Sequence, residues 1–370
     1  MEGRIKRFFP GGSTCRGYVS FFDHILPWAQ ASKIFVIKGG PGVGKSTFIR
    51  EIGERISKRG IDIEFLHCSA DSGSLDGVVI PRYGIALIDG TAPHVIDPKY
   101  PGCVDEIINL GDFWDETGIR KHKKDMLALQ EEISRCYKRG FGYLKAAKTV
   151  FDEMQEIYSW SIDEKKVCQT CEEVINKVFS DVRNKEKVSR QRHLFASAIA
   201  PEGLVNFLDN LFEGVKERFI LKGAPVLART RLLNAVLDMA LMKGLDVEIF
   251  HCPLSPERVE HIIIKDLNVG FITSVEPHVL SQEKPDDLII NFDEALTDSE
   301  FSRYVDDVEY YRKILAELLD KAVGCFGRAK ALHDRLESFY ITNMDYNRIN
   351  RKMEDTYGAI IKLIDSVNSE

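Results

Sequence analysis

The N-terminal part of the chain alternates short apolar runs with one amphipathic segment. Ile34–Ile37 predict a short buried strand, and apolar residues at helical spacing predict a helix over about 45–59. Further apolar runs predict strands at 62–67, 78–80, 85–89 and 107–110. Strands that alternate with a helix are typical of a mostly parallel sheet, so the pattern predicts an α/β fold. Residues 18–22 are expected to open a helix that leads into the first strand.

This pattern occurs twice. Phe35–Pro41 aligns with Phe219–Pro225, and the alignment continues without a gap to Ile96 over Leu280. Identical residues along it include His67/His251 and His94/His278, and many other positions exchange one apolar residue for another. We therefore interpret the chain as a tandem duplication. Retention of the histidines in both copies favours a core role for them over catalysis.

A long, charged and helical segment follows each predicted core. Apolar residues three and four apart from Met126 to Ile157 form a seam that predicts a helix about 48 Å long. The seam recurs from Val308 to Phe339, and in each copy turn residues are followed by another helix. We expect a helical hairpin after each core, with the seam serving helix packing or, alternatively, a partner-binding groove. The predicted domains are 1–112 (core), 113–190 (hairpin), 191–295 (core) and 296–370 (hairpin).

A glycine-rich loop joins the first strand to the first helix. Gly39 is followed by four residues and then by Gly44, Lys45 and Ser46. Glycines let backbone N–H groups turn around phosphate oxygens, and the helix N-terminus adds positive potential. The loop resembles the Walker A motif of P-loop NTPases, which implies that Lys45 contacts the terminal phosphates and that Ser46 binds Mg²⁺. The implied nucleotide-binding residues are Gly39, Gly40, Pro41, Gly42, Val43, Gly44, Lys45, Ser46 and Thr47.

Two aspartates complete the predicted site. The strand at 85–89 ends in Asp89, similar to the Walker B arrangement in which an aspartate holds Mg²⁺ through water; alternatively, Asp89 is only a turn residue. Asp71 follows the strand at 62–67 and is a candidate base or Mg²⁺ contact, or a solvated loop residue. The candidate catalytic residues are therefore Lys45, Asp89 and Asp71, and the candidate Mg²⁺ ligands are Ser46 and Asp89.

The second copy lacks these features. Gly42, Gly44, Lys45 and Asp89 are replaced by Val226, Ala228, Arg229 and Thr273. The larger side chains crowd the space that phosphate needs, and arginine does not reproduce the point contact of lysine. We therefore expect a degenerate core that does not bind a nucleoside triphosphate in the usual way. Its Lys222, Arg229 and Thr230 could instead hold an anionic regulator.

The duplicated chain, with one intact Walker A motif and one eroded copy, resembles an uncharacterised group of bacterial tandem-duplicated P-loop ATPase or nucleotide-kinase-like proteins. The resemblance implies binding of ATP with Mg²⁺, and the sequence has no Asn-Lys-x-Asp element for reading guanine. We expect a slow or regulated ATPase that uses the first repeat, because Gly90 follows Asp89 where many ATP-hydrolysing families carry a glutamate. The alternatives are a phosphotransferase with a helical lid and a non-catalytic nucleotide-dependent switch or scaffold.

Composition and net charge indicate which broad class of protein this chain belongs to. The chain has 370 residues, 44% hydrophobic and 29% charged, which is typical of a globular protein. The net charge of −7 argues against a general nucleic-acid binder. No secretion signal or long apolar run occurs in the sequence, so a cytoplasmic location without membrane contact is expected. The helical hairpins are the expected surface for a protein partner.

Overall fold

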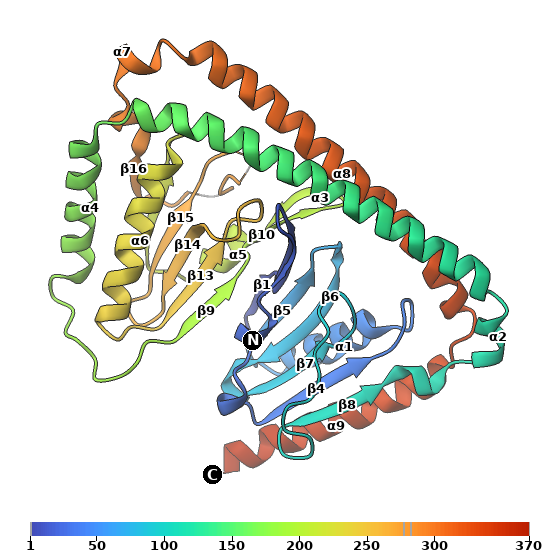
Figure 1. The fold of residues 1–370 in the computed structure, drawn as a ribbon. Helices are drawn as coiled ribbons and strands as arrows, with labels where there is room; N and C mark the ends of the chain where they lie inside the picture. The colour runs from blue at the N-terminus through green and yellow to red at the C-terminus, as the bar shows by residue number, and fades with distance from the viewer. Residues whose placement is uncertain (1, 277, 282, 370) are drawn as a thin grey trace.

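A computed structural model shows two six-stranded sheets with long helices running across both of them (Figure 1). The structure describes residues 2–276, 278–281 and 283–369. Both sheets are mixed but mostly parallel, which confirms the prediction of an α/β fold. Within the described ranges, no helix is both long and apolar enough to cross a membrane.

The first sheet has the strand order β1-β5-β6-β7-β4-β8. Its strands are β1 (Ile5–Phe8), β4 (Lys33–Lys38), β5 (Ile63–Cys68), β6 (Asp71–Ile80), β7 (Ile85–Asp89) and β8 (Asp105–Asn109). β6 runs antiparallel to both of its neighbours, whereas the other pairs are parallel. The helix α1 (Lys45–Ser57) packs its apolar side on one face of this sheet. Short 3-10 segments occur at Phe22–His24, Trp28–Gln30, Pro81–Tyr83 and Leu110–Phe113.

The second sheet repeats this topology. Its strands are β9 (Gln191–Leu194), β12 (Glu217–Lys222), β13 (Val247–His251), β14 (Val259–Ile264), β15 (Val269–Thr273) and β16 (Leu288–Asn291). Their order, β9-β13-β14-β15-β12-β16, matches the first sheet strand for strand, and β14 is again the antiparallel member. The helix α6 (Val226–Met242) corresponds to α1, and a 3-10 turn follows β16 at Phe292–Ala295. Each half of the duplication therefore forms its own sheet.

The two sheets share one hydrophobic core between them. Phe8, Val36 and Leu66 of the first sheet lie in the same buried cluster as Ile220 and Phe250 of the second. The short helix α5 (Leu208–Phe212) contributes to this cluster as well. These residues are almost fully buried, so the shared cluster joins the two repeats.

A short hairpin precedes β4 in the first repeat and β12 in the second. The hairpins are β2 (Gly11–Thr14) with β3 (Gly17–Ser20), and β10 (Ser197–Ala200) with β11 (Gly203–Asn206). The helix predicted to open at residues 18–22 is therefore wrong. Val19 of β3 and Phe21, two residues later, pack against Phe9 and Phe195, so this stretch follows the period-two pattern of a strand.

The two long helices pack along each other. α3 (Lys123–Trp160) and α8 (Val305–Ile341) lie side by side over both sheets (Figure 1), and their predicted seams form shared apolar clusters. α3 stays unbroken through Gly140, whose missing side chain makes room for Phe326: a Cβ there would lie 2.4 Å from the ring. The seam is thus a helix-packing surface, as the first of the two interpretations predicts.

The shorter helices are exchanged between the repeats. α4 (Glu164–Phe179) follows α3 but packs against α6 of the second repeat. α9 (Tyr346–Ser369) follows α8 but covers the first sheet beside α1 (Figure 1). The predicted hairpin within each repeat therefore needs a correction, because each long helix pairs with its counterpart and its second helix crosses to the other core. The helices α2 (Glu116–Arg120) and α7 (Asp298–Phe301) are short links before the long ones.

Candidate functional site

The glycine-rich loop lies between the end of β4 at Lys38 and the start of α1 at Lys45. Gly42 and Gly44 have φ angles of 68° and 88°, a left-handed conformation that side chains with a Cβ rarely adopt. Gly44 is also the N-cap of α1, so no side chain satisfies the first N–H groups of this helix. The local sequence thus leaves the N-terminus of α1 without a side-chain cap, and a helix end of this kind attracts anions.

The Lys45 side chain lies along this loop. Its Nζ donates hydrogen bonds to the carbonyls of Gly39, at 3.1 Å, and Gly40, at 2.8 Å. The same nitrogen is 3.6 Å from Oδ2 of Asp89. Both side chains are largely buried, so their mutual attraction is weakly screened by solvent. Lys45 and Asp89 are therefore brought together as the sequence predicts.

Asp89 ends β7 directly beside β4, paired in register with Ile37. Its Oδ1 accepts hydrogen bonds from the backbone N–H and the hydroxyl of Thr91, at 2.9 and 2.6 Å. Ser46 keeps its hydroxyl near the same loop, where its Oγ accepts a hydrogen bond from the N–H of Leu75 at 2.9 Å. The Ser46 hydroxyl and the Asp89 carboxylate, whose Oδ2 faces Lys45, are oxygen ligands of the kind that suits Mg²⁺.

Asp71 does not join this group. It starts β6, accepts a hydrogen bond from the hydroxyl of Ser74 at 2.8 Å and lies 3.8 Å from Nζ of Lys330 on α8. The structure thus places Asp71 at a partly exposed contact between the first sheet and the second long helix. This position matches the alternative interpretation of Asp71 more closely than a catalytic role.

Two further side chains lie beside Asp89, and one of them, His94, was assigned to the core from the sequence. Asp76 of β6 and His94 of the loop after β7 present ligand atoms within 4.8 Å of one another and of Asp89. Burial, together with the charge of Asp89, raises the pKa of Asp76 to about 8. Burial also lowers the pKa of His94 to about 4, so the ring is neutral at pH 7. The register that places Asp76 across from Asp89 has no signature in the sequence.

The second repeat contributes side chains to the loop of the first. Glu337 of α8 accepts a hydrogen bond from the N–H of Gly42 at 3.2 Å, and Tyr346 of α9 donates one to the carbonyl of Gly42 at 3.3 Å. Tyr340 packs so closely on Gly40 that a Cβ there would lie 2.7 Å from its ring. None of these residues could be found from the sequence, because neither the packing of α8 over the first repeat nor the exchange of α9 was predicted.

A groove opens beside the tip of the loop. It has a volume of about 400 Å³ and lies between Pro41, the start of α3 and the end of α8. Its lining combines the charged residues Glu116, Arg120 and Lys123 with the apolar surfaces of Met126, Leu336 and Tyr340. The groove is therefore large enough for a small molecule and has donors for an anion.

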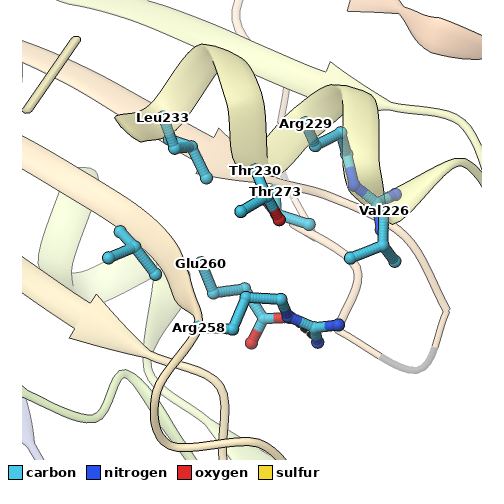
Figure 2. A pocket seen from close by; sticks show the side chains of 8 residues that line it. Val226, Arg229, Thr230, Leu233, Arg258, Glu260 and Thr273 are labelled. Carbon is cyan, nitrogen blue, oxygen red and sulfur yellow. Dashed lines mark hydrogen bonds and ion pairs between the residues drawn. The ribbon is translucent and has the colours of Figure 1, made fainter. Parts of the chain in front are cut away.

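The equivalent place in the second repeat is filled (Figure 2). Arg229, which replaces Lys45, is buried and donates a hydrogen bond to the carbonyl of Gly223. Arg258 lies 3.3 Å from the carboxylate of Glu260, the counterpart of Asp76, and the cavity between these residues measures about 10 Å³. That volume holds at most one water molecule, so a phosphate group does not fit.

The predicted anion cluster of the second repeat is not assembled. Arg229 and Thr230 line the small cavity, but Lys222 pairs with Glu283 at 2.7 Å.

His67 and His251 lie between the repeats, where their rings contact Phe9 or Phe21. This place fits the core role predicted for them, whereas His94 faces the carboxylates of the loop site.

Comparisons of the chain with protein-family models, with curated proteins and with solved structures found no match.

Proposed function

We propose that this chain binds ATP with Mg²⁺ in its first repeat and is a slow or regulated ATPase, with the second repeat as a structural or regulatory partner. The observation that carries the proposal is the difference between the two equivalent sites. The first has left-handed glycines before the helix and Lys45 beside Asp89, whereas the second holds a buried arginine and a cavity of about 10 Å³.

In this proposal different residues of the chain bind the phosphates and the Mg²⁺ ion. The N–H groups of the loop and of the first turn of α1 bind the phosphates, and Lys45 neutralises their terminal charge. Ser46 and Asp89 would hold Mg²⁺, partly through water, and the ion would supply charge stabilisation at the phosphates. A protein partner of the long helices would contact their outer faces, because α3 and α8 already fill each other's seams.

Isothermal calorimetry with purified protein tests the binding step. We expect Mg-ATP to bind once per chain and the Lys45→Ala variant to bind it much more weakly, while Thr230→Ala in the second repeat leaves the affinity unchanged. Mg-GTP serves as the control for the base. Absence of binding with any nucleoside triphosphate, or equal occupancy of both repeats, would contradict the proposal.

A phosphotransferase is the second candidate, and the groove beside Pro41 favours it. The groove is lined by Arg120 and Lys123 and lies next to the tip of the phosphate loop. An acceptor bound there would approach the end of the triphosphate. Measurement of ADP with and without a panel of small acceptors separates the candidates: production without an acceptor supports the ATPase, and acceptor-dependent production supports the transferase.

A further inference from the structure

Three side chains from different parts of the first repeat converge beside the phosphate loop. Asp76 lies in β6, Asp89 ends β7 and His94 lies in the loop after β7. Their ligand atoms, two carboxylate oxygens and one ring nitrogen, all lie within 4.8 Å of one another. Asp76 is one step beyond the antiparallel pair Gly77–Ile88, so the two carboxylates are cross-strand neighbours. Like charges in this position repel each other unless a cation or a proton lies between them.

His94 is held in place by residues that are not ligands. Its ring stacks on Phe22, with the ring centres 4.4 Å apart and the planes 10° apart, and Nδ1 lies 3.5 Å from the hydroxyl of Tyr18. Only 6% of His94 is exposed, yet its Nε2 has no hydrogen-bond partner among the described residues. A hydroxyl on one ring nitrogen and a buried, unpartnered second nitrogen are the arrangement in which a histidine commonly binds a metal.

The second repeat provides an internal comparison. There the acidic position is Glu260, and Arg258 lies 3.3 Å from its carboxylate. The residue at the position of Arg258 in the first repeat is Ser74, which is neutral and donates its hydrogen bond to Asp71 instead. Thr273 further removes one carboxylate from the second site. The second repeat thus carries a buried arginine beside its acid, whereas in the first repeat Lys45 lies 3.6 Å from Asp89 and a serine stands at the position of Arg258.

We propose that Asp76, Asp89 and His94 bind a divalent first-row transition metal such as Mn²⁺, Fe²⁺, Co²⁺ or Zn²⁺. Two carboxylates and one imidazole suit these ions, whereas Mg²⁺ and Ca²⁺ prefer oxygen ligands throughout. Three protein ligands leave coordination positions open for water or for an oxygen of a substrate. Binding at these residues does not require a nucleotide, so the proposal goes beyond the proposed function and is tested separately from it.

Co²⁺ is the probe, because its absorption spectrum reports coordination by nitrogen and oxygen. The full-length protein is freed of metal with a chelator and titrated with Co²⁺ without nucleotide. We expect one Co²⁺ per chain, an increase in thermal stability on addition of the ion, and a loss of affinity of more than about tenfold in His94→Gln. The matched control is His278→Gln in the second repeat, which should bind Co²⁺ like the wild type.

Two more variants keep the test decisive. Asp76→Asn keeps the shape of the side chain but cannot ionise, so it should fold at least as well as the wild type and still bind Co²⁺ more weakly. Lys45→Ala, which should lose nucleotide, should bind Co²⁺ as tightly or more tightly, because a cation 3.6 Å from Asp89 is removed. Absence of Co²⁺ binding to the wild type, unchanged binding in folded Asp76→Asn and His94→Gln, or binding that requires ATP would overturn the proposal.

Discussion

Glu337 and Gln155 make the same contact in opposite repeats. Glu337 of α8 accepts a hydrogen bond from the N–H of Gly42, and Gln155 of α3 accepts one from the N–H of Val226, the residue equivalent to Gly42. Each phosphate-loop position is therefore held by the long helix of the other repeat. The pair differs in charge, and the negative member touches the loop to which we assign the nucleotide.

This difference predicts that Glu337 weakens nucleotide binding. His333 on the same helix and the positive Lys45 hold the pKa of Glu337 below its usual value, so the side chain is anionic at neutral pH. The Glu337→Gln variant keeps an acceptor for Gly42 but removes a charge that repels phosphate. We expect its affinity for Mg-ATP, measured by calorimetry, to rise roughly three- to tenfold, or on the order of 1 kcal/mol.

Gln155→Ala is the matched control, because it changes the same contact at the filled site and should leave ATP affinity unchanged. A lower affinity in Glu337→Gln would show instead that the carboxylate assists the bound state. Contact between this helix and the loop also offers a route by which nucleotide occupancy could move α8 relative to α3.

The second prediction concerns Arg192, which joins the repeats. Its guanidinium donates hydrogen bonds to Glu64 at 2.6 Å and to Glu248 at 3.1 Å, and both carboxylates are buried. Arg192→Met leaves Glu64 buried without its partner, so we expect a loss of about 3–5 kcal/mol in the free energy of unfolding. Denaturation by urea measures this loss.

The control for this loss is Arg135→Met, which breaks an exposed pair with Glu131 on α3 and should cost under about 0.5 kcal/mol. Adding Glu64→Leu to Arg192→Met should recover much of the stability, because the uncompensated charge is then removed. Equal losses from the exposed and the buried arginine would show that the interface charges do not stabilise the fold.

Buried histidines predict a pH dependence of stability. Burial lowers the pKa of His67 and of His251 from 6.5 to about 4, and His193 lies 2.8 Å from the ring nitrogen of His251. The folded state keeps these rings neutral, while the unfolded state takes up protons below about pH 6.5. Stability is therefore fully present above pH 6.5 and falls as the pH decreases toward 4, by about 3 kcal/mol for each ring.

Urea denaturation at pH 7.5 and at pH 5 measures this effect. His251→Phe keeps an aromatic ring against Phe21 and removes one titrating group, so the difference in stability between the two pH values should become smaller. A variant with the same pH dependence as the wild type would show that His251 does not titrate during unfolding.

The sequence predicts the parts of this structure that depend on local pattern. The run Ile34–Ile37, the glycines after it and the apolar spacing of the following helix appear where they were expected, because strand burial and left-handed turns leave local signatures. The seams of α3 and α8 were also predicted. Their partners were not, because periodicity shows which face of a helix is buried but not which element buries it.

The functional neighbourhood shows the same limit. Lys45 and Asp89 lie together as predicted, because Lys45 follows β4 by a short loop and Asp89 ends the neighbouring strand β7. His94 was set aside because the second copy keeps a histidine at this position, and Asp76 was not among the candidates. Their convergence depends on the pairing of β6 with β7 across a whole sheet, and Glu337 reaches the site because the long helix α8 of the second repeat packs over the loop of the first.

The packing of the long helices gives a prediction with a control two residues away. A Cβ on Gly140 would lie 2.4 Å from the ring of Phe326, whereas nothing lies within 4 Å of one on Gly142. Gly142→Ala should therefore raise the free energy of unfolding by about 0.5–1 kcal/mol through helix propensity alone. Gly140→Ala gains the same propensity but forces α3 and α8 apart, so we expect a net loss of about 1–3 kcal/mol. Opposite shifts of the urea midpoint would support this arrangement, and stabilisation by both substitutions would contradict the close approach of α8 at Gly140.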